Sequence, residues 1–573
     1  MPDAYSVVLQ RLQSAFDAIV PGADPVLRPS DRADFQANGA LALAKQVGRS
    51  PREVAEEVVA AADLADLCSE VEISGPGFIN LTLGGEFLAD QVAAMSGDDR
   101  LGVAIASHPQ TMVIDYSSPN VAKEMHVGHL RSTVIGDALA RVLSHLGHNV
   151  LRENHIGDWG TPFGMLIEHL IDEGGADNAE TFSVRDLNEF YAGARLLFDT
   201  DPTFADRCRQ RVVLLQSGDP ETLRVWRIFV AESIRHNDEV YDMLGVLLTD
   251  EDILGESFYN PELPVVVDDL AAQDLLVEHD GAMCVFPEGF ENRKGDPLPL
   301  IVRKSDGGYG YPATDLACIR DRTGRRGATT LIYVVGNEQA LHFRLVFAVA
   351  TLAGYLPTTS SAVHVAFGMV LDTDGKKKAS RAGTSERLVD LLSEAVDRAR
   401  AQMETRPSDL SADEQDHLAH ALGIGAVKYA DLSTERVRDY VFDWDRMLAF
   451  EGDTGPYLQY AHARIRSIFR RGNVARPEPG TRPAIVENQE RLLALQLLEF
   501  GAAVDATAEL FSPSKLAGYL FDLATTFTTF YEGCRVLVED EAIRTSRLAL
   551  SDLTARVLAQ GLSLLGMEAP SQM

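Results

Sequence analysis

Residues 112–143 contain the feature that most constrains the fold, because an apolar run, a polar turn and a long amphipathic pattern follow one another there. The run Met-Val-Ile at 112–114 predicts a short buried strand, which Pro119 ends. Apolar residues then recur at the spacing of an amphipathic helix; they are Leu130, Val134, Ala138, Leu139 and Val142. The polar residues between strand and helix are therefore the first candidates for a functional site.

Two histidines lie at this junction. His126 and His129 are three residues apart on the first helical turn, so their side chains can point the same way, and Gly128 leaves the backbone open to a ligand. The unpaired N–H groups and positive potential of a helix N-terminus favour a phosphate. The alternatives are ordinary surface or core histidines and half of a metal site. A metal site lacks further ligands, because the five cysteines form no Cys-x-x-Cys pair and no His-Glu-x-x-His occurs.

The junction resembles the HIGH signature of class I aminoacyl-tRNA synthetases, in the form typical of arginyl-tRNA synthetases. The matching residues are Ser-Pro-Asn at 118–120, Ala-Lys at 122–123, His-Val-Gly-His at 126–129, Leu-Arg-Ser-Thr at 130–133 and Asn-His-Ile-Gly-Asp-Trp-Gly-Thr at 154–161. Similar segments follow at 311–315, 333–342 and 454–464. The resemblance covers nearly the whole chain and implies a ligase that uses ATP and Mg²⁺ to activate L-arginine and to transfer it to the 3′-terminal adenosine of tRNA(Arg).

The polar, basic loop at 372–385 lies where the family carries its KMSK motif. If Gly383 matches the glycine that follows that motif, Lys377 takes the position of the first lysine and Ser380 that of the second. The second lysine normally offsets charge on the phosphates, and the resemblance implies that Lys123, three residues before His126, replaces it. The predicted catalytic residues are His126, His129, Lys123 and Lys377, and ATP binding is assigned to His126, Gly128, His129 and Lys377.

Selecting arginine over lysine requires carboxylates, because a planar guanidinium donates a fork of hydrogen bonds that an ammonium does not reproduce. Asp115 ends the first strand, and Asp315 follows Tyr311 by four residues, a helical spacing that lets both side chains meet one ligand. Asn120 and Gln339 match family positions that hold the substrate's α-amino group. The expected arginine-binding residues are Asp115, Ser118, Asn120, Tyr311, Asp315 and Gln339. For the acids and amides among them, the alternative is an ordinary cap or strand-end polar residue.

The remaining pattern predicts a multidomain α/β chain. Residues 1–107 are expected to form an N-terminal α+β domain, with a helix from Tyr5 to Val20, a capping box at 50–53 and strands at 70–73 and 78–83. Residues 108–385 alternate strand and helix, which predicts a Rossmann-like parallel sheet; its strands are expected at 112–115, 148–153, 298–303, 330–335 and 362–371. A helical insertion is expected at about 175–260, a helical connecting segment at 386–449 with a second capping box at 411–414, and an all-α bundle at 450–573.

Both end domains are expected to bind tRNA. In arginyl-tRNA synthetases a domain similar to residues 1–107 holds the D-arm corner, which implies that Phe78 stacks on a base and that Asn80 contacts a base edge. The alternative is that Phe78 is an ordinary core residue. Residues 450–573 correspond to the anticodon-binding domain of the family, which implies that Tyr457 and Arg464 contact tRNA.

The net charge of −33 opposes this interpretation when it is taken globally, because phosphate binding relies on lysine and arginine. Binding depends on local charge, however, and basic clusters occur at 320–326, 376–381 and 464–471, each of which is alternatively a solvated face. The 573 residues contain no apolar run of membrane-spanning length, no secretory signal and five unpatterned cysteines. We therefore expect a cytoplasmic monomer with no membrane partner and no structural metal.

Three other functions fit parts of this pattern. The HxGH motif also marks small nucleotidylyltransferases that never touch RNA, although the extra end domains count against that class. A non-catalytic tRNA- or protein-binding relative has the missing KMSK lysine as its only support. An active duplicate that serves a specialised pathway has the same motifs as a housekeeping enzyme.

Overall fold

The computed structural model describes residues 4–121, 123–174, 184–376, 387–404 and 410–573. Its N-terminal part is a four-stranded antiparallel sheet of order β1-β2-β4-β3 covered by helices. The predicted helix and both predicted strands are confirmed, whereas two further strands of three residues each were too short to predict from periodicity. The elements are α1 (Ala4–Ile19), β1 (Leu27–Pro29), β2 (Phe35–Ala37), α2 (Ala40–Val47), α3 (Pro51–Ala62), β3 (Cys68–Ser74) and β4 (Phe78–Leu83).

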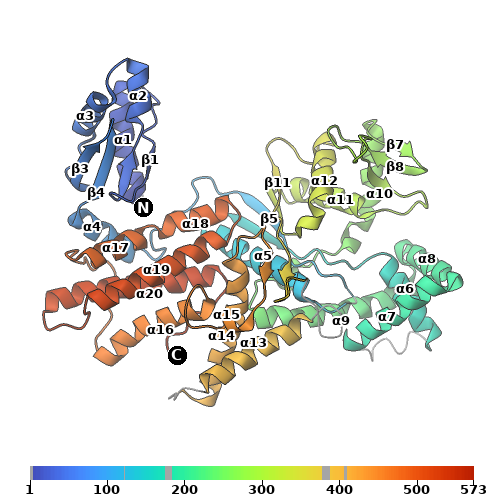
Figure 1. Cartoon of the computed structure of the whole chain (residues 1–573). Coiled ribbons are helices and arrows are strands. Elements are labelled where there is room, and N and C mark those ends of the chain that lie inside the picture. Colours follow the sequence, from blue (N-terminus) through green and yellow to red (C-terminus); the bar gives the residue numbers. More distant parts are fainter. Residues whose placement is uncertain (1–3, 122, 175–183, 377–386, 405–409) are drawn as a thin grey trace.

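The predicted helix starts are supported by their caps. Ser50 Oγ accepts a hydrogen bond of 3.3 Å from the Glu53 N–H, and proline occupies the first turn of α3. At α14 (Ala412–Leu432), the Ser411 and Glu414 side chains each accept from the backbone N–H of the other residue. Helix α4 (Gly85–Ser96) leaves the N-terminal domain and packs against α17 (Asn488–Leu498) of the C-terminal part (Figure 1).

The centre of the chain is a parallel sheet of order β11-β10-β5-β6. Helix α5 (Val127–His145) connects β5 to β6, and β10 then pairs with the other side of β5. The strand order thus reverses between β5 and β10, where α/β sheets bind ligands in the crevice beyond the carboxyl ends of their strands. The strands are β5 (Thr111–Asp115), β6 (Asn149–Glu153), β10 (Thr330–Tyr333) and β11 (Ser361–His364).

Two strand predictions for this sheet were wrong. The strand predicted at 298–303 is β9 (Leu300–Arg303), which belongs to a separate antiparallel sheet with β7 (Val277–His279) and β8 (Ala282–Val285). The strand predicted at 362–371 is instead two strands, because it is interrupted near Gly368. The backbone there passes so close to Arg438 that a Cβ at position 368 would lie 2.6 Å from the Arg438 backbone. Its second part, β12 (Val370–Leu371), pairs with β13 (Tyr440–Val441). An apolar run predicts a strand but does not identify its neighbour.

Helices lie between the successive strands of the central sheet in the chain. The elements between β6 and α13 that are not yet named are α6 (Thr161–Asp172), α7 (Val184–Thr200), α8 (Pro202–Ser217), α9 (Pro220–Leu244), η2 (Asp250–Asp252), η3 (Glu256–Glu262), α10 (Leu263–Ala272), α11 (Tyr311–Gly324), η4 (Asn337–Gln339) and α12 (Ala340–Leu352). The predicted arginine-binding residues lie at the end of β5, in the turn between β5 and α5, in the first turns of α11 and in η4.

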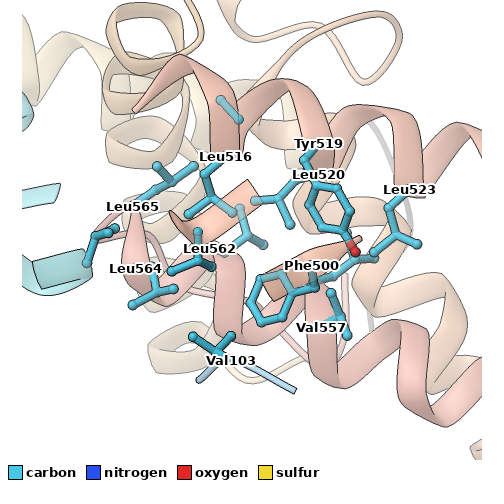
Figure 2. Packing of buried hydrophobic residues seen from close by; sticks show 14 of the residues in the cluster. Val103, Phe500, Leu516, Tyr519, Leu520, Leu523, Val557, Leu562, Leu564 and Leu565 are labelled. Atoms are coloured by element: carbon cyan, nitrogen blue, oxygen red, sulfur yellow. The ribbon is translucent and has the colours of Figure 1, made fainter. Parts of the chain in front are cut away.

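The C-terminal part is helical, and its apolar positions pack together as predicted. Figure 2 shows Phe500 and Leu520 among buried leucines and valines of α18, α19 and α20, joined by Val103 from the segment that precedes the sheet. The helices are α13 (Leu388–Met403), α14, α15 (Trp444–Met447), α16 (Gly455–Gly472), α17, α18 (Phe500–Glu509), α19 (Ser514–Gly533) and α20 (Glu541–Leu564). No helix in the described ranges is long and apolar enough to span a membrane.

Candidate active site

The two histidines of the HxGH motif cap the first turn of α5. His126 is the N-cap residue, and its Nδ1 accepts a hydrogen bond of 3.0 Å from the Gly128 N–H. His129 Nδ1 accepts one of 3.1 Å from the His126 N–H. The two rings lie 4.1 Å apart between centroids, at an angle of 39°. The side chains therefore lie together at the helix N-terminus, as their spacing predicted.

These backbone bonds fix the tautomer of both imidazoles. A ring nitrogen that accepts an N–H cannot carry the proton, so each neutral ring carries it on Nε2. Burial lowers the pKa of His129 to about 3, with smaller contributions from His126 and Lys123. His129 is thus a neutral Nε2–H donor at pH 7, a form suited to hydrogen-bonding a phosphate oxygen.

Gly128 is required by the His126 ring. A Cβ at this position would lie 2.7 Å from Cε1 and 2.9 Å from Nδ1 of His126, distances at which the ring must move. The sequence indicated that this glycine opens the backbone to a ligand. The structure gives a second reason, because only glycine lets the N-cap imidazole fold back onto its own helix.

The polar turn after β5 is held in an uncommon conformation. Ser117 and Ser118 have φ values of +69° and +46°, in the left-handed region. Ser118 Oγ donates to Asp115 Oδ1 at 2.8 Å and accepts from the His155 N–H at 3.1 Å, and these bonds hold the turn. Strained positions of this kind concentrate where a ligand or reacting group must be positioned.

The predicted arginine-binding carboxylates have different surroundings. Asp115 is 6% exposed, and its Oδ2 lies 2.7 Å from Arg322 Nη2 while Oδ1 accepts from Ser118. Asp315, on α11, lies 2.6 Å from His342 Nε2, and that hydrogen bond is the main cause of the raised pKa of His342. Asp115 is therefore paired with a resident guanidinium, whereas Asp315 is paired with an imidazole.

The remaining predicted arginine-binding residues lie at the carboxyl edge of the sheet. Tyr311 is 69% exposed at the start of α11, one turn before Asp315. Asn120 is exposed and forms an isolated parallel β-bridge with Gly157. Gln339 is exposed in η4, immediately before α12. The helix N-termini thus bring these residues toward one edge, although direct contact with arginine remains a prediction.

Sequence reasoning missed Glu256, which begins η3. Burial and the neighbouring charges of Asp158 and Asp315 raise its pKa to about 8. Glu256 in turn contributes to the raised pKa of Tyr311, so it lies near both predicted arginine-binding residues of α11. No motif or periodicity surrounds Glu256 in the sequence, and only the fold brings it to this edge. Three neighbouring carboxylates favour a cationic ligand.

Of the two predicted phosphate-binding lysines, the structure describes Lys123. Lys123 is exposed, and its ammonium lies 4.5 Å from the centroid of the Tyr191 ring on α7. Lys377 lies outside the described residues, as does Ser380. The described start of their loop is a turn in which Asp372 Oδ1 accepts from the N–H groups of Asp374 and Lys376, both at 3.0 Å.

The predicted tRNA-binding residues lie at the two ends of the chain. Phe78 is half-buried and Asn80 is 4% exposed, with its amide bonded to Gln36, Ser74 and Glu72. Asn80 therefore contacts a base edge only if it exchanges these bonds. On α16, the half-buried Tyr457 ring packs on Phe521, and Arg464 lies over the Tyr531 ring at 4.8 Å.

The arginines of the basic cluster at 320–326 form ion pairs with carboxylates of the same chain. Arg320 pairs with Glu262, and Arg325 pairs with Asp321. Arg322 is fully buried with Asp115 and Glu153. Arg322 is therefore not available to a phosphate, whereas Arg320 and Arg325 form their ion pairs at the surface.

Candidate metal ligands do not cluster in the part of the chain that the structure describes. There, no three His, Cys, Asp or Glu side chains are arranged to hold a metal ion.

Three family models match successive parts of the chain. They are the arginyl tRNA synthetase N-terminal domain over residues 6–83, the catalytic domain of tRNA synthetases class I (R) over 91–444, and the DALR anticodon binding domain over 458–573. The chain belongs to the arginyl-tRNA synthetase family. The resemblance inferred from the HxGH segment is therefore confirmed, as is the multidomain α/β fold class.

Curated relatives and solved structures agree with this family. The chain is 54% identical to the arginine–tRNA ligase of Thermobifida fusca, with 100% of both chains covered, and 51% identical to that of Frankia casuarinae, with 98% and 97% covered. Its fold matches the arginyl-tRNA synthetase of Plasmodium falciparum with a TM-score of 0.86 at 29% identity, covering 100% of both chains. For the Thermus thermophilus enzyme the TM-score is 0.79 at 26% identity, covering 99% and 100%.

Proposed function

We propose that the chain catalyses the ATP-dependent attachment of L-arginine to the 3′-terminal adenosine of tRNA(Arg) for protein synthesis. The observation that carries this proposal is the reciprocal capping of His126 and His129 at the carboxyl edge of the sheet. It places two imidazoles with fixed tautomers at a helix N-terminus, beside the crevice where the strand order reverses. Membership in the family gives this geometry its reaction class.

In the first step, a carboxylate oxygen of arginine attacks the α-phosphorus of ATP. The new bond forms as the bond from that phosphorus to the bridging oxygen breaks, and pyrophosphate leaves with the electron pair. The Nε2–H groups of His126 and His129 donate to phosphate oxygens, while Lys123 and Lys377 offset their charge. A Mg²⁺ ion bound with the nucleotide would neutralise part of the phosphate charge.

In the second step, a ribose hydroxyl of the terminal adenosine attacks the carbonyl carbon of arginyl-adenylate. The ester forms as the bond from the carbonyl carbon to the phosphate oxygen breaks, and AMP leaves with the electron pair while the hydroxyl proton passes to the departing phosphate. Neither step requires a covalent intermediate with the protein, so positioning and charge stabilisation supply the catalysis.

Arginine is recognised at both of its ends. Asp315 and Glu256 accept the guanidinium, and the Tyr311 hydroxyl borders them. Asn120 and Gln339 hold the α-amino group, and Asp115 with Ser118 supports the turn beside it. Lysine offers no fork of donors to two carboxylates, so a buried acid stays unpaired and its affinity falls.

The end domains hold the tRNA. In the N-terminal domain, residues 1–107, Phe78 and Asn80 contact the D-arm corner. In the C-terminal domain, residues 450–573, Tyr457 and Arg464 contact the anticodon arm. Residues 108–385 form the catalytic domain and 386–449 the connection to the C-terminal bundle. The enzyme acts as a monomer in the cytoplasm, and local charge rather than the net charge of −33 governs tRNA binding.

Charging of tRNA with radiolabelled amino acids tests this function. The purified chain is expected to transfer arginine, and not lysine, to tRNA(Arg) in the presence of ATP and Mg²⁺. A matched reaction with another tRNA species controls for non-specific transfer. Charging with a different amino acid, or none with arginine, would refute the proposal.

A further inference from the structure

Three residues stand in a row across the carboxyl ends of the central strands. Tyr333 of β10 is the register partner of Asp115 of β5, and Asp115 is that of Glu153 of β6. Register partners in a parallel sheet point to the same face, and neighbouring strands are about 4.8 Å apart. Two buried carboxylates therefore lie side by side, and their mutual repulsion needs a counter-charge.

Arg322 of α11 supplies a counter-charge to both carboxylates, and Arg326 adds a second one to Glu153 alone. Its Nη2 lies 2.7 Å from Asp115 Oδ2 and 2.5 Å from Glu153 Oε2, and its Nε donates to Glu153 Oε2 at 2.7 Å. The guanidinium carbon lies 5.0 Å from the centroid of the Tyr333 ring. The Arg322 side chain is 1% exposed, so solvent screens these interactions little.

The same helix carries the residues proposed to receive the substrate's guanidinium. Tyr311 and Asp315 lie at the start of α11, and Arg322 lies near its end. Within the described ranges, no arginine or lysine is paired with Asp315 or Glu256, whereas Arg322 fills the acidic pair of Asp115 and Glu153. Near the end of α11, Asp115 and Glu153 are thus paired with the guanidinium of Arg322. Near its start, no guanidinium of the described residues is paired with Asp315 or Glu256.

We propose that Arg322 is a positioning residue that determines where substrate arginine binds. Its guanidinium occupies the Asp115–Glu153 pair, which would otherwise attract the guanidinium of the substrate. It thereby directs the substrate to Asp315 and Glu256, and it holds Asp115 in place for Ser118. This inference rests on the proposed function and adds a residue to its arginine site.

The test compares Arg322→Lys and Arg322→Met with Arg326→Met. Arg326 is the matched control, because it pairs with Glu153 at 2.9 Å and with Asp321, whereas among the described residues the arginine paired with Asp115 is Arg322. We expect Arg322→Met to raise the KM for arginine in tRNA charging by about tenfold or more and the KM for ATP by less than about threefold. Arg322→Lys keeps the charge but loses the fork, so part of the arginine affinity returns.

Thermal unfolding and the control separate the outcomes. If Arg322→Met does not fold, Arg322→Lys alone decides the comparison, since it retains a buried positive charge. Equal increases of the two KM values in Arg322→Lys, or the arginine-selective increase in Arg326→Met as well, would overturn the positioning role while leaving the proposed function intact. A wild-type chain that does not charge tRNA with arginine would instead refute the proposed function, and this inference with it.

Discussion

The Nδ1 atom of His129 accepts a hydrogen bond of 3.1 Å from the backbone N–H of His126, the residue that caps the same helix. This bond leaves Nε2 as the protonated nitrogen of the neutral ring. Burial, the main cause of the lowered pKa of His129, keeps the ring neutral at working pH. Helix α5 therefore presents a donor whose form does not change in the physiological range.

The pH dependence of His129 follows from this arrangement. Its folded-state pKa of about 3 lies below the ordinary value of 6.5, so protons bind preferentially to the unfolded chain as the pH falls below 6.5. We expect this loss of stability to begin near pH 6.5 and to continue toward about 3. The imidazole resonances of His129 should not titrate between pH 5.5 and 8, and an NMR midpoint inside that window would contradict the account.

Replacing Gly128 tests the close approach to His126. In Gly128→Ala the new methyl group displaces the ring, so we expect adenylate formation to slow by about two orders of magnitude with little change in Tm. Gly324→Ala is the matched control, because a Cβ at that helical glycine meets no heavy atom within 4 Å. The role of Gly128 would be refuted if the rates of adenylate formation of the two variants agreed within a factor of about three.

Lys123 is the predicted substitute for the missing KMSK lysine. We expect Lys123→Ala to lower the rate of arginine activation by about two orders of magnitude without loss of fold, because charge on the phosphates is then less well offset. Lys294→Ala, which removes another exposed lysine of the same domain, should leave the rate unchanged. Single-turnover activation kinetics measure both, and unchanged turnover in Lys123→Ala would refute this role.

Asp315 is proposed to receive the substrate guanidinium. Asp315→Ala should weaken arginine binding by about a hundredfold and ATP binding by less than about threefold, because only arginine loses a charged partner. Equilibrium titration with each substrate separates the two effects. Equal losses would show that Asp315 acts through the fold, since its partner His342 lies on the neighbouring helix α12.

If Glu256 receives the substrate guanidinium as proposed, we expect arginine binding to depend on its protonation. With a pKa of about 8, its carboxyl is mostly protonated at pH 7 and becomes a better guanidinium acceptor as the pH rises through 8. The KM for arginine should therefore fall between pH 6.5 and 8.5, and Glu256→Gln should abolish that fall while it raises the KM overall. A wild-type KM that does not change over this interval would contradict the assignment.

The sequence alone predicted the parts of the fold that depend on local pattern. The strand before the HxGH segment, the helix after it and the caps at Ser50 and Ser411 all follow from residues close together in the chain, and all are confirmed. The strand at 298–303 was misplaced because strand pairing depends on distant partners.

Long-range pairing also explains what was missed at the site. Arg322 was counted within a basic cluster that alternatively binds phosphate or forms a solvated face, yet its partners Glu153 and Asp115 are 169 and 207 residues away. Glu256 has no motif around it, and its surroundings come from Asp158 and Asp315 on other elements. Such buried charges obey no sequence period, so only the folded structure reveals them.

Arginine-dependent exchange between pyrophosphate and ATP, measured with and without tRNA, is the most direct test of arginine activation by this chain. We predict exchange that requires arginine and that appears only when tRNA(Arg) is added, as the family resemblance implies. Exchange that proceeds without tRNA would indicate a free-standing adenylating enzyme, and no exchange under either condition would contradict the proposed activation of arginine at the His126–His129 site.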